Sequence, residues 1–211
     1  MSRHSRLLAS FVIAGGVIYL AIEVALHFLR PDYHPARRFL SEYAVGNFGF
    51  LGTIAFCVMA ATNATLVAAL FLEVRRSSLL LVSCGLLAVV SVGFGLLALF
   101  PTDLSNPTGG PPLIRTSTGV IHDVSASILS SALGGASLTL PFAYRLDDRW
   151  RPAFSRIIPF GVAIPLTLCV AGLVSWQWCG AGQRLVVATG LVWIFTNAAL
   201  LLRPGIKRVS P

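Results

Sequence analysis

The sequence predicts an all-α integral membrane protein, built as one bundle of six transmembrane helices. Six apolar, almost uncharged runs of about 20 to 26 residues alternate with short polar loops. A run of 18 or more apolar residues is long enough to cross the roughly 30 Å hydrocarbon core of a bilayer as a helix. Charged residues make up only 11% of the 211 residues, whereas soluble domains carry about 25%. The six runs and their loops use almost the whole chain, so we expect a single membrane domain.

We expect spans at residues 7–29, 47–72, 79–100, 120–144, 156–176 and 183–202. The first follows two arginines, as a signal peptide does, but its apolar stretch is longer than the 7–15 residues of a signal core. The second and fourth carry small residues every four positions, which is typical of close helix packing. The fifth contains Pro159 and Pro165, which predict kinks. The third and sixth are plain apolar runs.

The basic residues predict the orientation of the bundle. A net charge of +8 would suggest nucleic acid binding in a soluble protein, but these arginines lie in membrane loops, and no nucleic acid partner is expected. Eleven Lys and Arg residues fall on the side of the two termini and five on the other side. Because basic residues are retained on the cytoplasmic side, both termini are predicted to be cytoplasmic, in the plasma (inner) membrane. The sequence does not predict an oligomeric state.

The unusual polar residues gather at the outer ends of the spans. Glu23 and His27 are four residues apart in the first span and share one helical face. A carboxyl group in lipid is costly, so Glu23 must pair or be protonated. The pair is either a hydrogen-bonded staple between helices or a site for ligand binding or proton transfer.

Further polar residues follow in the outer loops. Ser41 precedes Glu42, and the two are read most simply as a helix start. Asp103 follows the third span and is either a cap for loop amides or a functional carboxylate. His122 is either a hydrogen-bonded residue of the fourth span or a metal ligand or general base, because neutral imidazole serves both roles. Arg30, Arg37 and Arg38 are expected to contact lipid headgroups; an anionic-substrate site is the less favoured reading.

Two short motifs resemble those of a known family. Arg30-Pro31-Asp32-Tyr33 followed by Ser41-Glu42, and Phe100-Pro101-Thr102-Asp103 followed by Gly119-x-x-His122, resemble the six-span family catalogued as domain of unknown function 998. The likeness extends over essentially the whole chain in span number and motif order. It implies a membrane location and directs attention to Ser41, Asp103 and His122 without giving them a role.

A more distant likeness is to the CREST superfamily of membrane hydrolases, which use Ser, Asp and three His around zinc. Ser41, Asp103 and His122 would supply one residue of each type, with His27 and His34 as further candidates. That superfamily has seven spans and an HxxxH pair in its last one. This chain has six spans and no histidine in its last span.

Three functions remain open on these observations. The first is a metal-assisted hydrolase of a lipid or other amphiphile, in which His122 with His27 or Asp103 holds a metal. The sequence does not identify the metal, and zinc is one candidate. In it Asp103 or Glu23 acts as base, and Ser41 orients metal or substrate. The second is a carrier of a lipid or small molecule, or an accessory membrane subunit, without catalysis. The third and least favoured is an electron carrier with one haem between His27 and His122.

Overall fold

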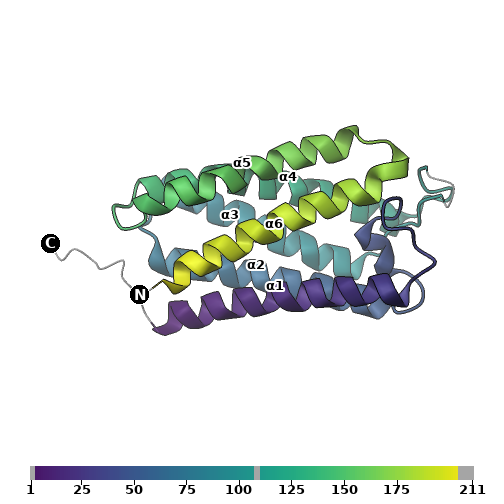
Figure 1. The fold of residues 1–211 in the computed structure, drawn as a ribbon, viewed down its shortest axis with the longest axis horizontal. Coiled ribbons are helices and arrows are strands. Elements are labelled where there is room, and N and C mark those ends of the chain that lie inside the picture. The colour runs from purple at the N-terminus through teal and green to yellow at the C-terminus, as the bar shows by residue number, and fades with distance from the viewer. Residues whose placement is uncertain (1–2, 107–109, 204–211) are drawn as a thin grey trace.

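The structure, a computed structural model, describes residues 3–106 and 110–203, and within these ranges it is all-helical with no strand (Figure 1). The six long helices are α1 (Arg3–Leu29), α2 (Gly49–Glu73), α3 (Ser78–Leu99), α4 (Ser117–Arg145), α5 (Phe154–Leu173) and α6 (Cys179–Leu202). Each is long and apolar enough to cross a membrane. The predicted six-helix membrane bundle is confirmed, and α5 continues through Pro159 and Pro165.

The helices form a closed ring. Each helix packs against the next in the sequence, and α6 also packs against α1. Many large apolar side chains face outward from this ring, such as Phe11, Phe28 and Leu173, which are 66%, 79% and 86% exposed. Exposed apolar surface on this scale marks a surface for a partner or a membrane. The ring therefore has an apolar outer surface suited to lipid.

The two ends of the bundle differ in how they are closed. We call the end made by residues 30–48, 100–106, 110–116 and 174–178 the site end. The opposite end, where α1 begins and α6 ends, is the terminal end (Figure 1). Of the eleven basic residues counted on the terminal side, Lys207 and Arg208 lie outside the described residues.

Buried polar contacts close the terminal end. Glu73, at the last position of α2, forms an ion pair with Arg149 at 2.8 Å and accepts a hydrogen bond from the Ser5 hydroxyl at 2.5 Å. The Trp150 indole donates to the Glu73 carbonyl at 3.1 Å and stacks on Tyr144. These contacts tie α1 and α2 to the connection that leads into η2 (Arg151–Ala153).

Specific backbone features shape the site end. The connection between α1 and α2 contains a short 3₁₀-helix, η1 (Leu40–Ala44), so Ser41 and Glu42 do begin a helix, but one that ends before α2. Gly46 and Phe48 take positive φ values of 78° and 60° in the turn between η1 and α2. A positive φ is easy for glycine and uncommon for other residues. The connection from α5 carries η3 (Trp176–Trp178) directly before α6.

Candidate functional site

A cavity lies inside the ring, and we call it the inner cavity. It has a volume of about 100 Å³ and is lined by residues of α2, α3, α4 and α6, with Tyr19 from α1 and two residues from η1. Most of its wall is apolar, including Phe56, Met59, Phe94 and Leu129. Its polar lining residues are Tyr19, Ser41, Asn63, His122, Ser130 and Gln183.

A second, open hollow lies at the site end, and we call it the polar hollow. It has a volume of about 450 Å³, and its polar lining residues are Ser41, Thr102, Asp103, Ser105, Arg115, His122, Asp123, Ser127 and Gln183. Ser41, His122, Ala126 and Gln183 line both the hollow and the inner cavity. These four residues, which we call the junction, stand where a polar space adjoins an apolar one.

His122 is the buried titratable residue of the junction, with only 2% of its surface exposed. Its Nδ1 lies 2.7 Å from the Phe100 carbonyl oxygen, so Nδ1 must carry the proton and donate it in a hydrogen bond. Nε2 is then an acceptor, and it makes no hydrogen bond with any residue in the described part of the chain. Fixing one ring nitrogen against a backbone carbonyl is the arrangement that prepares the other for a ligand or a proton.

Two further groups of the junction are available to a ligand. The Ser41 hydroxyl makes no hydrogen bond within residues 3–106 and 110–203, although the residue is only 7% exposed. The Gln183 carbonyl oxygen accepts from the Leu40 amide at 2.5 Å, which leaves its NH₂ group as a donor. Junction and hollow together therefore offer a hydroxyl, an amide donor and an imidazole acceptor.

Asp103 is held at the entrance to α4. Its two carboxylate oxygens accept from the Thr116 amide at 3.0 Å and the Thr116 hydroxyl at 2.6 Å, and Arg115 lies at 3.8 Å. Thr116 in turn caps the helix by accepting from the Gly119 amide. The Thr116 hydroxyl, followed by its backbone amide, holds the pKa of Asp103 below its usual range. The carboxylate thus anchors the loop that forms one wall of the hollow.

This anchor predicts a dependence on pH. A carboxyl whose pKa is lowered in the folded state contributes stability that is complete above its unfolded pKa of about 4 and is lost as the pH falls through the folded value. We expect the protection factor of the Thr116 amide against hydrogen exchange to fall as the pH is lowered below about 4. In Asp103→Asn the protection should be lower at neutral pH and should not change over that range. Equal protection in both proteins at every pH would contradict the anchoring role.

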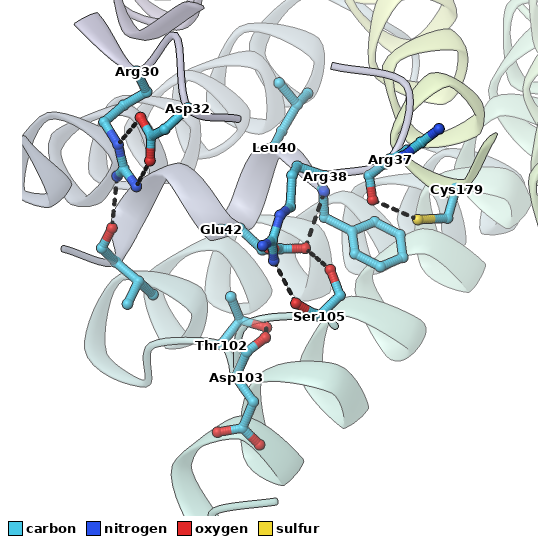
Figure 2. Close-up of polar contacts among 12 residues, drawn as sticks. Arg30, Asp32, Arg37, Arg38, Leu40, Glu42, Thr102, Asp103, Ser105 and Cys179 are labelled. Atoms are coloured by element: carbon cyan, nitrogen blue, oxygen red, sulfur yellow. Dashed lines mark hydrogen bonds and ion pairs between the residues drawn. The ribbon is translucent and has the colours of Figure 1, made fainter. Parts of the chain in front are cut away.

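The neighbouring wall is built around Glu42, which is fully buried. Its carboxylate pairs with Arg38 at 2.7 Å and accepts from the Phe39 amide and the Ser105 hydroxyl (Figure 2). Arg30 donates to both Asp32 oxygens and to two carbonyls at the end of the connection. Arg30 and Arg38, predicted as headgroup contacts, are therefore engaged within the protein, whereas Arg37 is exposed.

Glu23 and His27 form contacts different from the expected pair. His27 Nδ1 lies 2.6 Å from the backbone oxygen of Glu23, and Arg184 Nε donates to His27 Nε2 at 3.0 Å. The Glu23 carboxyl interacts instead with Tyr19 and Arg184, and its Oε2 has no hydrogen-bond partner among the described residues. Contacts with Arg184 of α6 and with Tyr19 thus take the place of the expected side-chain pair.

The predicted metal ligands do not converge. His27 uses both ring nitrogens for protein contacts and lines neither the cavity nor the hollow, whereas His122 lines both. Asp103 shares the polar hollow with His122. Within the described part of the chain, no group of three or more His, Cys, Asp or Glu side chains is placed to hold a metal ion. The site thus brings together Ser41, Asp103 and His122, and leaves Glu23 and His27 outside.

Sequence reasoning did not select Gln183, Ser130 or Asn63 as site residues. Gln183 stands in the first turns of α6, far from both motifs in sequence. Asn63 and Ser130 lie inside spans, where a single amide or hydroxyl is often satisfied by its own helix. One indication of Asn63 and Ser130 was present in the sequence: a polar side chain at mid-membrane depth costs free energy unless it has a hydrogen-bond partner.

Comparison with known proteins gives a family. A family model described as "Protein of unknown function (DUF998)" matches residues 13–200. No match was found among curated proteins or among solved structures. The family match spans all six helices and includes both motifs of the site end. The chain therefore belongs to the DUF998 family of proteins of unknown function.

Proposed function

We propose that this protein binds an amphiphile, with the polar group of the ligand in the polar hollow and the adjoining part of its apolar chain in the inner cavity. The observation that carries the proposal is the junction, where Ser41, His122, Ala126 and Gln183 line both spaces. An apolar pocket with a few convergent polar groups is the usual form of a small-molecule site. A molecule that crosses the junction must be polar at one end and apolar at the other.

The charges of the hollow favour one class of headgroup. Arg115 pairs with Asp123 at 2.8 Å and lies near Asp103, so the three charged groups leave the hollow with an excess of one negative charge. A simple anion would face two carboxylates, of which only one is fully compensated. An uncharged head rich in hydroxyl groups, or a zwitterionic one, fits these donors and acceptors better. A monoacylglycerol has such a head.

The basic residues support an outward orientation for this site. Of the five arginines predicted on the outer side, Arg30, Arg38, Arg115 and Arg184 make ion pairs or hydrogen bonds within the protein. Internal contacts therefore account for these basic residues on the side with fewer of them, which agrees with the positive-inside assignment. We accordingly place the hollow on the outside of the plasma membrane and the termini in the cytoplasm.

Blocking the junction tests the proposal. Ala126→Phe places a ring where the hollow meets the inner cavity, and we expect the Kd for 1-stearoyl glycerol, measured by native mass spectrometry, to rise at least about tenfold, or about 1.4 kcal/mol. Ala64→Phe is the matched control, since Ala64 is exposed on α2 and lines neither space. Equal affinity in wild type and Ala126→Phe, with both proteins folded, would contradict binding across the junction.

A second candidate is hydrolysis of an ester in the bound amphiphile, and it is favoured by His122 Nε2. The ester of such a molecule joins its polar and apolar parts, so it would lie at the junction. Nε2 would take a proton from water as the resulting hydroxide attacks the ester carbonyl, and would return that proton to the leaving alcohol.

The hydrolysis candidate has its own measurement. Release of stearate from 1-stearoyl glycerol should fall by about 10²-fold or more in His122→Gln, with ligand affinity changed far less. Ser131→Ala, which changes a serine of α4 that lines neither the hollow nor the inner cavity, should hydrolyse at the wild-type rate. No release by the wild type above a protein-free blank would restrict the site to binding.

A further inference from the structure

A fully buried amide with an unused oxygen lies deep in the inner cavity. Asn63 is 0% exposed, and its side-chain NH₂ donates to the Met59 carbonyl at 2.9 Å. That donor fixes the orientation of the amide, because the oxygen cannot face a carbonyl oxygen. The remaining atom, Oδ1, is buried and has no hydrogen-bond partner among the described residues. Asn63 lines the inner cavity.

A second unused group lines the same cavity. The Ser130 hydroxyl makes no hydrogen bond with any residue in the described ranges, although Ser127 and Ser131 of the same helix donate to carbonyls four residues earlier. Ser130 also lines the inner cavity. A serine inside a helix usually satisfies its hydroxyl in the way that Ser127 and Ser131 do.

Helix geometry gives the two groups comparable depths. Asn63 lies 14 residues after Gly49, the first residue of α2, and Ser130 lies 13 residues after Ser117, the first residue of α4. At about 1.5 Å per residue, both are about 20 Å along helices that begin at the site end. Both positions are therefore about half-way along helices of 25 and 29 residues, deep in the roughly 30 Å hydrocarbon core of a bilayer. An unpaired acceptor at such depth is costly unless something donates to it.

We propose that the inner cavity recognises a hydroxyl group on the apolar part of the ligand through two hydrogen bonds, with Asn63 Oδ1 as acceptor and the Ser130 hydroxyl as donor. The inference rests on the proposed amphiphile binding and narrows it to a class of ligand: lipids whose chain carries a hydroxyl several carbons beyond the headgroup. The hydroxyl of the ligand donates to Oδ1 and accepts from Ser130. A plain alkyl chain would leave both protein groups unpaired, and a site built for a hydroxyl rejects such an analogue.

The test compares glycerides that differ only in the position of one hydroxyl. The probes are 1-stearoyl glycerol and three hydroxystearoyl glycerols, with the hydroxyl near the head, at mid-chain and near the methyl end. We expect the wild type to bind one of the two deeper isomers about tenfold more tightly than the unsubstituted glyceride. Asn63→Leu and Ser130→Ala should each remove most of this preference. Thr62→Val is the matched control and should keep it, because the Thr62 hydroxyl already donates to the Val58 carbonyl and Thr62 does not line the cavity.

The possible outcomes distinguish hydroxyl recognition from the proposed amphiphile binding on which it rests. If all four glycerides bind the wild type equally and Ala126→Phe weakens them all, amphiphile binding stands, Asn63 Oδ1 holds only a water, and the inference is overturned. A preference that persists in Asn63→Leu also overturns it. If no glyceride binds the wild type, both proposals fail. The comparison of isomers on the wild type needs no variant, so it remains decisive even where a variant does not fold.

Discussion

Replacing Glu42 by alanine is expected to lower the free energy of unfolding by about 3–5 kcal/mol. The carboxylate is fully buried. It forms an ion pair with Arg38 and accepts hydrogen bonds from the Phe39 amide and the Ser105 hydroxyl. The alanine variant leaves the Arg38 guanidinium, itself only 13% exposed, without its counter-ion. A buried charge stripped of its partner costs far more than the intact pair contributes. Unfolding of the detergent-solubilised protein would measure the loss.

A surface ion pair provides the control for this variant. Asp148 and Arg151 lie 2.5 Å apart at the terminal end with side chains 84% and 63% exposed. Exposed pairs contribute about 0–1 kcal/mol, so Asp148→Ala should change the free energy of unfolding by no more than about 1 kcal/mol. The double variant Arg38→Met with Glu42→Leu should recover part of the loss, because no charge is then left unpaired. Equal stability of Glu42→Ala and Asp148→Ala would show that Glu42 does not hold the site end.

The same substitution should disturb ligand binding. Ser41, which lines both spaces of the site, is the chain neighbour of Glu42 in η1. Ser105, held by Glu42 and Arg38, forms another wall of the hollow. The two walls are therefore joined by one buried carboxylate. We expect 1-stearoyl glycerol to bind Glu42→Ala more weakly than wild type even under conditions in which the variant is folded.

The fold could be predicted from sequence because hydropathy acts locally. Each apolar run identifies its own helix without knowledge of the others, and all twelve helix ends fall within four residues of the predicted ones. The short 3₁₀-helix η1 was the exception. Its residues Ser41 and Glu42 carry a helix-start signal, but the turn at Gly46 and Phe48, both with positive φ, separates them from α2.

The site could be predicted only in part. The two motifs directed attention to Ser41, Asp103 and His122, which do share the polar hollow. The partners of these residues could not be predicted, because they depend on helix rotation and loop path. Glu42 meets Ser105, 63 positions away, and His27 meets Arg184, 157 positions away. Likewise, sequence cannot tell whether Asn63 at mid-span is satisfied, since that depends on which face of α2 borders the cavity.

Replacing Arg184 by methionine is expected to destabilise the protein by about 3 kcal/mol or more, because several buried acceptors lose their donor together. One guanidinium donates to His27 Nε2 and to the Pro35 and Arg38 carbonyls. It thereby ties α6 to α1 and to the loop that carries η1. Arg184→Lys should recover little, since an ammonium group cannot reproduce the planar fork of donors.

Arg37 provides the matched control, because it is an exposed arginine in the same loop and its side chain makes no hydrogen bond or ion pair with the described residues. Arg37→Met should unfold like the wild type, whereas Arg184→Met should unfold earlier and show faster hydrogen exchange at residues 34–38. The Pro35 and Arg38 carbonyls of this loop accept hydrogen bonds from Arg184. Hydrogen exchange in the loop therefore reports the loss of these contacts directly. Identical exchange in the two variants would mean that the loop is held by Glu42 and Arg38 alone. In that case the position of Ser41 at the junction would depend on the Glu42 carboxylate and not on α6.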